Sequence, residues 1–541
     1  MRIFRFILSY FALFFSAALF GAGAPLSFNE LNKKPPSRVK DFASLLFLRS
    51  TSDDTQQKRV IFYSLKAPKP LHFAAFANGR KDASKLLACR KTETSKLAAA
   101  DPACIAIMIN TAKAESISNA DLIKIAAKIK NIDPFNAAIL NAMATKNSLE
   151  TAAKDLDVFY RVALEISNPF FKKHSDSSFS RETIADIQKD SRFSLFLERS
   201  AQLSFGAKLL KSLAAYSDET KLDFKGAFYL GVIRVMQNDL KSAIAAFKSA
   251  ETKALTRYEK DRALFWLYLI GKNESDLFKL FSSREINFYS LYFRLERDRP
   301  LPAILTQAPA LKDAKDIYGD DRLFDPFFAG EFARKIADRD TKWLQNEIKK
   351  LGGKNAEAYR AAIYYALAGA NSLPNYYLNP YPEAYDSLSI DELAMTLAIM
   401  RQESRYIPAA LSTSYAMGSM QMMPFVLEAM MKENKDKGDL WSFFDPYRQA
   451  PYAIKHIKWL RRKLTNPLFI AYAYNGGLGF ATRTIEGNKL FKQGEFEPFL
   501  SLERMPLEEP REYGKAVLAN YLVYRRLLGA PITPRAVFQT K

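Results

Sequence analysis

Residues 390–404 read IDELAMTLAIMRQES, and this stretch decides how the rest of the chain is interpreted. Ser389 and Glu392 stand where a helix would begin, and their three-residue spacing is that of a capping box before an apolar run. Apolar residues then recur at helical spacing, and Glu403 falls close to the direction of Met400 on the same face. The pattern predicts a helix with Glu403 in its last turn.

A carboxylate at the end of a largely apolar helix is a candidate general acid. Partial burial would raise the pKa of Glu403, and the negative end of the helix dipole would raise it further. A carboxyl group that is still protonated near neutral pH can serve as a general acid. The alternative is an ordinary surface glutamate at a helix end, and this stretch alone favours that alternative.

Three more blocks of distinctive sequence follow Glu403-Ser404. They are Gly418–Pro424, which reads GSMQMMP, Ala473–Gly477, which reads AYNGG, and Glu503–Lys515, which contains ERMP and REYGK. In this order, the four blocks resemble the signature of the soluble lytic murein transglycosylases, whose catalytic domain has a goose-type-lysozyme-like fold. The resemblance covers the C-terminal part of the chain.

The chain before these blocks reads as one helix after another with short polar connectors. One stretch fits the spacing of a tetratricopeptide helix–turn–helix unit, through Leu230, Gly231, Ala243, Phe247 and Ala250. Its turn is predicted at residues 237–239. The aromatic-rich segments 261–269 and 287–295 are expected to form core rather than a ligand platform. Such pairs cannot bury their apolar faces alone, so a stacked α-superhelix is predicted.

The fold class expected is all-α, because glycine is sparse and long β-branched alternations are rare. Turn and breaker signals at residues 371–375 and 379–382 indicate a domain boundary. We therefore expect an α-superhelical domain over residues 25–378 and a lysozyme-like, mostly α catalytic domain over residues 379–541. A separate linker domain near residues 310–378 is an alternative subdivision of the first domain.

The resemblance implies a reaction with a single catalytic carboxylate. Glu403 would protonate the oxygen that links N-acetylmuramic acid to N-acetylglucosamine. It would then act as a base on the muramic C6 hydroxyl, which attacks C1 of the same sugar and leaves a 1,6-anhydro end without using water. An internal nucleophile gains from proximity, so the second carboxylate of ordinary glycosidases is not required.

The resemblance also implies supporting residues around Glu403. Tyr474 would orient Glu403 or the reacting sugar; the alternative is a core tyrosine. The expected substrate-binding residues are Ser404, Ser412, Gln421, Met423, Asn475, Glu503 and Tyr513. Met423 could equally be plain core, Ser412 a surface serine and Glu503 a structural salt-bridge partner. Two residues depart from the family pattern: Tyr415 stands where the family usually has glycine, and Ser419 replaces the usual leucine.

The N-terminal residues predict export. Arg2 and Arg5 precede the apolar run 7–20, and Ala22-Gly23-Ala24 fits a cleavage pattern. We expect residues 1–24 to be a cleaved signal peptide; the alternative is an uncleaved membrane anchor. No later stretch is long and apolar enough to span a bilayer, so a periplasmic protein without an integral span is expected.

The cysteines, the absence of metal-ligand spacing and the net charge indicate which cofactors and partners to expect. The chain has two cysteines, Cys89 and Cys104, which in an oxidising compartment predict one disulfide; two free thiols are the alternative. No cluster has metal-ligand spacing, so neither a metal nor another cofactor is expected. The net charge of +21 favours polyanionic partners. For an exported protein, the glycan strands of peptidoglycan are the expected partner, and nucleic acid is not.

The sequence thus predicts a lytic transglycosylase and leaves two alternatives. The first is a goose-type-like lysozyme that hydrolyses the same bond with water. The second is a non-catalytic wall-binding scaffold built on the superhelix, against which the intact Glu403-Ser404 and Tyr474-Asn475 pairs argue. Association with other cell-wall enzymes is left open.

Overall fold

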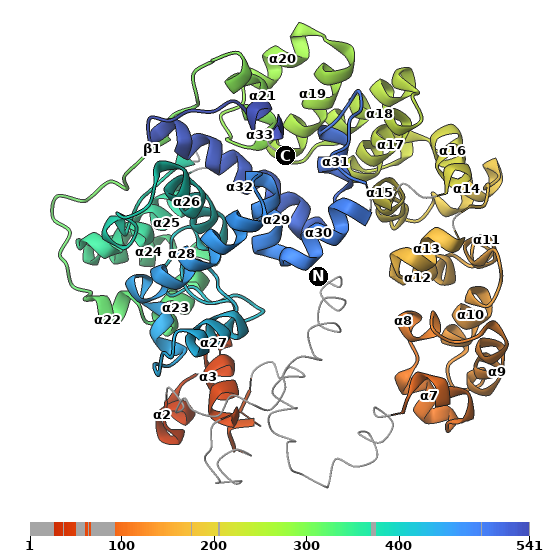
Figure 1. The fold of residues 1–541 in the computed structure, drawn as a ribbon, viewed down its shortest axis with the longest axis horizontal. Helices are drawn as coiled ribbons and strands as arrows, with labels where there is room; N and C mark the ends of the chain where they lie inside the picture. The colour runs from red at the N-terminus through yellow and green to blue at the C-terminus, as the bar shows by residue number, and fades with distance from the viewer. Residues whose placement is uncertain are drawn as a thin grey trace. The chain divides into compact units, whose positions relative to one another are not determined.

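The structure, a computed structural model, is built almost entirely of helices (Figure 1). It describes residues 26–35, 37–49, 60–62, 64–65, 92–174, 176–203, 206–368, 375–487 and 489–539. Within these ranges the only strands are the two-residue β1 (Ile304–Leu305) and β2 (Asn375–Tyr376), which pair in parallel. The predicted all-α fold class is confirmed. The predicted signal peptide and Cys89 lie outside the described residues.

Contacts within the chain divide it into two compact units. Unit 1 contains residues 1–81, 303–470 and 520–533, and unit 2 contains residues 82–302, 471–519 and 534–541. The boundary expected between residues 378 and 379 stays a prediction, as does the superhelical arrangement of the first domain.

Unit 1 is assembled from segments far apart in the sequence. Its helices are α2 (Phe28–Lys33), α3 (Arg38–Arg49), α22 (Asp320–Leu323), α23 (Pro326–Ala337), α24 (Thr341–Glu347), α25 (Glu357–Leu367), α26 (Ile390–Ser404), α27 (Pro424–Glu433), α28 (Pro446–Lys463), the start of α29 (Pro467–Gly476) and the end of α32 (Glu508–Leu527). The 3₁₀ helices η4 (Ile348–Lys350), η5 (Lys354–Ala356), η6 (Pro382–Ala384) and η7 (Trp441–Phe444) connect them.

Unit 2 contains a long succession of short helices. They are η2 (Thr94–Ala99), α7 (Pro102–Met108), α8 (Thr111–Ala114), α9 (Asn119–Ile129), α10 (Pro134–Met143), α11 (Ser148–Ala152), α12 (Leu156–Glu165), α13 (Asn168–His174), α14 (Arg181–Ile187), α15 (Phe193–Leu203), α16 (Ala207–Tyr216), η3 (Glu219–Lys221), α17 (Phe224–Met236), α18 (Leu240–Lys253), α19 (Arg257–Gly271), α20 (Glu274–Phe281) and α21 (Phe288–Glu296). To these it adds the C-terminal α30 (Leu478–Gly487), α31 (Phe499–Arg504), α33 (Pro534–Gln539) and the adjoining parts of α29 and α32. Cys104 lies in α7, and its predicted disulfide stays a prediction.

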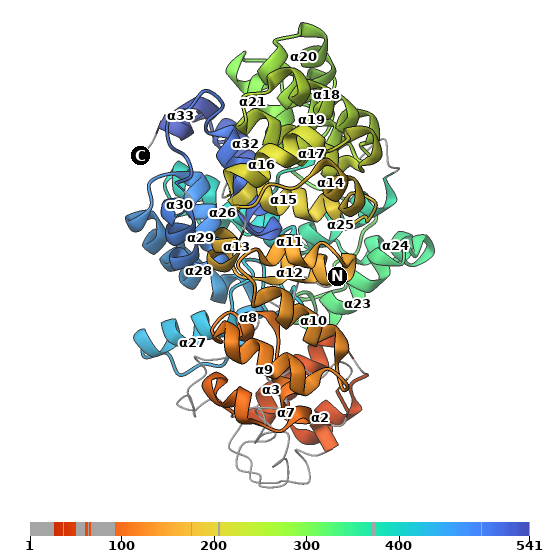
Figure 2. The same ribbon diagram turned by 90° about the vertical axis from the view of Figure 1, so that its right-hand side faces the viewer.

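The predicted helix–turn–helix unit is confirmed in α17 and α18, which lie side by side with α19 next to α18 (Figure 2). Gly231 is the point of closest approach, because a Cβ there would stand 2.8 Å from the ring of Phe247. The turn is made by Asn238, whose φ of 57° is left-handed. The missing side chain of Gly231 is therefore what lets Phe247 enter the helix pair.

The aromatic-rich segments form core, as predicted. Phe265 and Trp266 of α19 are fully buried, and so is Tyr289 of α21. Phe265 meets Tyr289 edge to face at 5.5 Å and Phe499 of α31 at 5.0 Å. The C-terminal helix α31 is thus packed into the core formed by the repeats.

The helix expected at residues 390–404 is present as α26, with the same bounds. Ser389 and Glu392 form the predicted capping box at its start. Within the described part of the chain, no helix combines the length and apolar character needed to cross a membrane.

The close approach at Gly231 can be tested by adding a side chain there. We expect Gly231→Val to lower the free energy of unfolding by about 1–3 kcal/mol, because Phe247 has no room to move away in a packed core. Gly487→Val is the matched control: Gly487 ends α30, and a Cβ added there would meet no atom within 4 Å, so its effect should stay within about 0.5 kcal/mol. Urea denaturation of the two variants measures both values; equal destabilisation would contradict the packing role.

Candidate active site

The start of α26 is held by an ionic cluster around Asp391. The carboxylate accepts hydrogen bonds from Tyr521, Arg461 and Arg525, the last at 2.6 Å. Burial opposes the ionisation of Asp391, but the Tyr521 hydroxyl and the Arg461 guanidinium outweigh it and lower its pKa. The cluster fixes the N-terminal end of α26, whereas Glu403 lies at the C-terminal end.

The other end of α26, which carries Glu403, is fixed by the residues that follow it. Arg405 and Tyr406 both adopt left-handed backbone conformations, with φ of 51° and 70°, and so end the helix sharply. Tyr406 is buried, its hydroxyl lies 2.6 Å from that of Tyr524, and its carbonyl accepts a hydrogen bond from Tyr381 at 3.0 Å. Glu403 itself is partly exposed, on a helix turn whose backbone cannot shift without breaking these contacts.

A compact loop, residues 410–423, lies against this end of the helix, and we call it the motif loop. Ser404 donates a hydrogen bond from its hydroxyl to the carbonyl of Ser419 at 2.8 Å. Met417 forms isolated bridges to Leu411 and to Met422, so the loop folds back on itself twice. The Glu-Ser pair and the second sequence block are therefore in direct contact, and Ser404 is used in joining them.

Gln449 of α28 is buried beside the motif loop, and its side chain is hydrogen-bonded to the loop backbone. Its amide nitrogen donates to the carbonyl of Met417 at 2.8 Å, and its oxygen accepts from the backbone N–H of Met420 at 3.0 Å. Gly418, with φ of 75°, leaves the space that the amide occupies, because a Cβ there would collide with Gln449. The sequence analysis did not identify Gln449, because nothing in a helical stretch distinguishes this glutamine from a surface one.

The predicted substrate residues in this loop are partly occupied by the loop itself. Gln421 donates from its amide to the carbonyls of Ala410 and Gly418, at 3.1 and 2.8 Å. Ser412 accepts from the backbone N–H of Ala416 at 2.9 Å. Met423 is partly exposed and stands at the N-terminal cap of α27. Ser412, Gln421 and Met423 are all partly exposed, so each keeps an accessible side in addition to its structural contacts.

Tyr415 has an uncommon backbone conformation for a large side chain. Its φ is 69°, and its side chain is buried. A left-handed conformation costs a residue other than glycine about 1–2 kcal/mol, which accounts for the preference of this place for glycine. The ring of Phe42 in α3, 5.0 Å away, is among the contacts that offset this cost. Ser419, the other departure, is fully buried, and its hydroxyl faces Gln449 at 3.4 Å.

Comparison with known proteins gives the family of this region. Residues 383–496 match the family described as "Transglycosylase SLT domain". We refer to this matched region, residues 383–496, as the SLT domain. The resemblance to the soluble lytic murein transglycosylases is confirmed, and the SLT domain includes the first three sequence blocks, while the fourth block lies just beyond it.

Individual relatives agree with this result over part of the chain. The soluble lytic murein transglycosylase of Escherichia coli (strain K12) is 31% identical over 136 residues, which are 25% of this chain and 20% of that protein. The membrane-bound lytic murein transglycosylase C of Mannheimia succiniciproducens is 26% identical over 186 residues, 30% of this chain and 52% of that protein. The chain therefore aligns with about a fifth of the soluble relative and about half of the membrane-bound one. Among solved structures, the alignment with an inactive mutant of the lytic transglycosylase Slt from Pseudomonas aeruginosa covers 92% of this chain and 88% of that one. The sequence identity is 15% and the TM-score is 0.44.

The SLT domain contributes to both units. Glu403, Ser404, Ser412, Gln421 and Met423 lie in unit 1, whereas Tyr474 and Asn475 lie in unit 2. Tyr474 is partly exposed in the last turn of α29, which ends at Gly476 and is followed by Gly477 with a left-handed φ of 84°. Asn475 donates to Glu509 at 3.4 Å.

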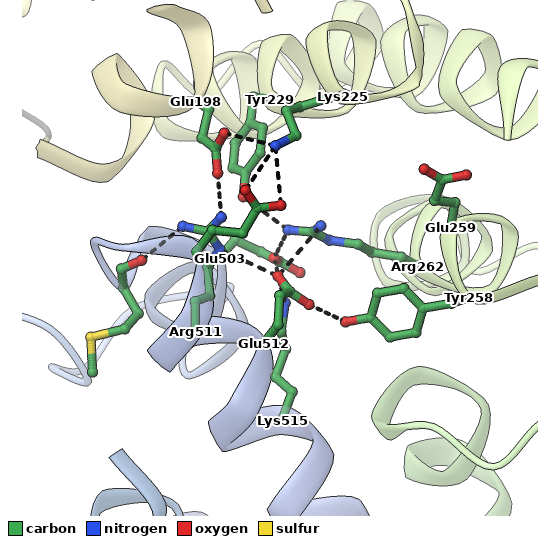
Figure 3. Close-up of polar contacts among 12 residues, drawn as sticks. Glu198, Lys225, Tyr229, Tyr258, Glu259, Arg262, Glu503, Arg511, Glu512 and Lys515 are labelled. Carbon is green, nitrogen blue, oxygen red and sulfur yellow. Dashed lines mark hydrogen bonds and ion pairs between the residues drawn. The ribbon is translucent and has the colours of Figure 1, made fainter. Parts of the chain in front are cut away.

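Beyond the SLT domain, the fourth block is built into a buried ionic network of unit 2 (Figure 3). The carboxylate of Glu503 accepts hydrogen bonds from Arg262, from Tyr289 at 2.6 Å, from Trp266 at 3.3 Å and from Lys515 at 3.3 Å. Burial opposes its ionisation, but Arg262 and Lys515 outweigh burial and lower the pKa of Glu503 to about 2. These contacts agree with the alternative role given to Glu503 above, that of a structural salt-bridge partner.

A second layer of the network surrounds Arg511, which is also fully buried. Arg511 pairs with Glu198 of α15 and donates to the carbonyl of Met505 at 2.9 Å. Glu512 accepts from Lys515 at 2.9 Å and from the hydroxyl of Tyr258. Tyr513, between them, is buried as well. The block Glu503–Lys515 thus joins the C-terminal helices to α15, α19 and α21.

Gln449→Glu tests the centre of the motif loop with a side chain of the same size. A carboxylate can accept from Met420 but cannot donate to Met417, so we expect a loss of about 1–3 kcal/mol at neutral pH. Burial would raise the folded-state pKa of the new carboxyl, so its protonated form can donate and the loss should shrink as the pH falls towards 5. Gln345→Glu, at an exposed position of α24, is the control, and chemical denaturation at pH 5 and pH 8 gives the comparison. A loss that does not depend on pH would contradict this role.

Glu503→Gln tests the ionic network. It removes the most deeply buried carboxylate of the network and leaves Arg262 and Lys515 with Glu512 as their remaining counter-charge, which costs about 3–5 kcal/mol. Because the folded pKa of Glu503 lies below its usual value of 4.5, the stabilisation is present above pH 4.5 and is lost as the pH falls towards 2. The stability difference between wild type and variant should decrease over that window.

The control for this variant is Glu508→Gln, which removes an exposed ion pair with Lys225 and should cost less than about 1 kcal/mol. Denaturation curves between pH 3 and pH 7 measure both variants. A constant difference across that range, or equal losses in the two variants, would be incompatible with a network centred on an ionised Glu503.

Proposed function

We propose that this protein is an exported lytic transglycosylase that cleaves the β-1,4 bond between N-acetylmuramic acid and N-acetylglucosamine in peptidoglycan. Glu403 first donates a proton to the glycosidic oxygen and then removes one from the muramic C6 hydroxyl. That hydroxyl attacks C1 of the same sugar, and the product ends in 1,6-anhydromuramic acid. Residues 1–24 would direct the protein to the periplasm.

The observation that carries this proposal is the placement of Glu403. It stands partly exposed on the last turn of α26, and the following residue, Ser404, is bonded to the motif loop at Ser419. One end of α26 is held by the partly buried contacts of Asp391 and the other by the buried contacts of Tyr406. A general acid needs such a fixed position, because small misplacements of a catalytic group reduce the rate strongly.

The sequence around Glu403 supports a reaction with one carboxylate. From Arg405 to Leu427 the chain contains no aspartate or glutamate. Glycosidases that use water or a covalent intermediate need a second carboxylate within about 5–9.5 Å of the first. The family pattern gives a role to one further glutamate in the four blocks, Glu503. Its side chain is buried and ion-paired. An internal C6 nucleophile removes this requirement.

Supporting roles follow the same proposal. Tyr474 would orient Glu403 or the sugar through its phenol, and Asn475, Gln421, Met423, Ser412 and Tyr513 would contribute to glycan binding. Glu503 would act indirectly, by holding the C-terminal helices in place. A hydrolase on the same fold remains the competing function, since it would use the same general acid.

The test is digestion of purified sacculi by the mature protein, followed by mass spectrometry of the released muropeptides. We expect products that end in 1,6-anhydromuramic acid, each one water lighter than the product of a lysozyme. Glu403→Gln should lower their release by at least about 100-fold, the usual contribution of a general acid. Glu433→Gln, at an exposed carboxylate of α27, is the control and should match wild type.

The other results would change the assignment. Reducing-end products would identify a hydrolase. Release that persists in Glu403→Gln would move the catalytic role to another residue, and binding to sacculi without any release would favour the scaffold alternative.

A further inference from the structure

Helix α3, which lies far outside the SLT domain in the sequence, contacts the motif loop and α27 at three places. Arg38 donates from Nη1 to the carbonyl of Leu411 at 3.2 Å. The ring of Phe42 lies 5.0 Å from that of Tyr415. Arg49 forms an ion pair with Glu428 of α27 at 3.0 Å. The first half of α3 thus contacts the motif loop through Arg38 and Phe42, and its last residue, Arg49, contacts α27, which lies next to α3 in Figure 1.

The helix α3 is itself firmly held in unit 1. Nine of its 12 residues are buried. Val39 packs against Gly330 of α23, where a Cβ would stand 3.4 Å from its methyl group. On another face, Phe47 and Leu48 join a small apolar cluster with Leu31 of α2, against which Trp441 of η7 packs. A rigidly seated helix of this kind can determine the position of a loop.

Tyr415 is the residue through which α3 acts on the motif loop. Its left-handed φ of 69° persists only if the surroundings determine it, and α3 provides part of those surroundings. Burial raises the pKa of the Tyr415 hydroxyl, with Asp41 adding to the rise and Arg38 opposing it. Charged groups of α3 therefore lie near Tyr415, whose ring lies 5.0 Å from that of Phe42.

The position of Tyr415 is passed on to the rest of the loop by short backbone contacts. Tyr415 donates from its N–H to the carbonyl of Ser412 at 3.1 Å, and the N–H of Ser412 donates to the carbonyl of Ala416 at 3.0 Å. Two residues beyond Tyr415, Met417 exchanges hydrogen bonds with Met422 at 2.9 and 3.0 Å. This chain of contacts leads from α3 to both sides of Gln421.

We propose that α3 clamps the motif loop, with Tyr415, Phe42 and Arg38 as positioning residues that set the loop for glycan binding. This inference rests on the proposed function, because it gives the clamped loop a glycan strand as its ligand. The clamp acts on binding more than on the chemical step, since none of the three residues supplies or accepts a proton in the reaction.

The decisive variants separate the ring, the hydroxyl and the backbone of Tyr415. Tyr415→Phe keeps the ring against Phe42, whereas Tyr415→Gly removes it but suits the left-handed φ, so the glycine variant loses the clamp without adding backbone strain. Arg38→Gln removes the contact with Leu411 at an exposed hydrogen bond and keeps the core intact. Lys335→Gln, which breaks an ion pair between α23 and Asp340 in the same unit, is the matched control.

Two measurements are made on the full-length mature protein. The first is amide hydrogen exchange over residues 411–422, which reports on the loop whether or not the protein is active. We expect exchange to rise about tenfold or more in Tyr415→Gly, to rise less in Arg38→Gln and to stay unchanged in Tyr415→Phe and Lys335→Gln. The second is the rate of muropeptide release at increasing amounts of sacculi, where KM should rise about tenfold in Tyr415→Gly while kcat changes less than about twofold.

The outcomes separate the two proposals. Wild-type exchange and wild-type KM in both Tyr415→Gly and Arg38→Gln would overturn the clamp, and so would a loss confined to kcat. If Tyr415→Gly does not fold, Arg38→Gln and Phe42→Leu decide by the same readouts. If wild type releases no product from sacculi, the proposed function fails, while exchange in the motif loop still decides whether α3 positions it.

Discussion

The C-terminal helices of unit 2 depend on one buried ionic interaction, that of Glu503 with Arg262 and Lys515. A carboxylate removed from water loses several kcal/mol of hydration, and only well-placed counter-charges make up for that loss. Here two cations, a tyrosine hydroxyl and an indole N–H converge on a single side chain. Removing either cation would leave the buried carboxylate of Glu503 with less counter-charge, so α31 and α32 are tied to the helices that carry these partners. These bonds are among the contacts that join α19 and α21 to the C-terminal helices within unit 2.

This constraint also gives Glu503 and Glu403 different chemical environments. Both oxygens of Glu503 accept hydrogen bonds, and its pKa is about 2, so it is ionised near neutral pH and cannot act there as a proton donor. Glu403 stands partly exposed on a helix end that buried tyrosines hold in place. Sites that combine acid and base chemistry commonly place two carboxyl groups in contrasting environments. In this protein the contrast leaves Glu403, and not Glu503, as the carboxylate that is open to solvent.

The sequence predicted what is local and missed what is distant. The capping box of α26, the turn at Asn238 and the entry of Phe247 beside Gly231 depend on residues close in sequence, and all three are present. The partners of Glu503 could not be derived, because Arg262 lies 241 residues away and a buried arginine looks like a surface one in a sequence. Gln449 could not be predicted for the same reason. Its partners are backbone groups of Met417 and Met420, and backbone groups are the same for every residue type. The export segment and the predicted disulfide partner lie outside the described residues and stay predictions.

The departure at Tyr415 shows how a distant segment can change what a position tolerates. A glycine would adopt the left-handed conformation there without strain, whereas for tyrosine it costs about 1–2 kcal/mol. Burying the aromatic side chain offsets that cost, since complete burial of a large apolar side chain is worth roughly 1.5–3 kcal/mol. Part of this burial comes from α3, whose Phe42 ring lies 5.0 Å from that of Tyr415. Residue 415 and the helix at 38–49 are therefore coupled: the aromatic side chain that makes a left-handed φ costly is also the side chain that packs on Phe42.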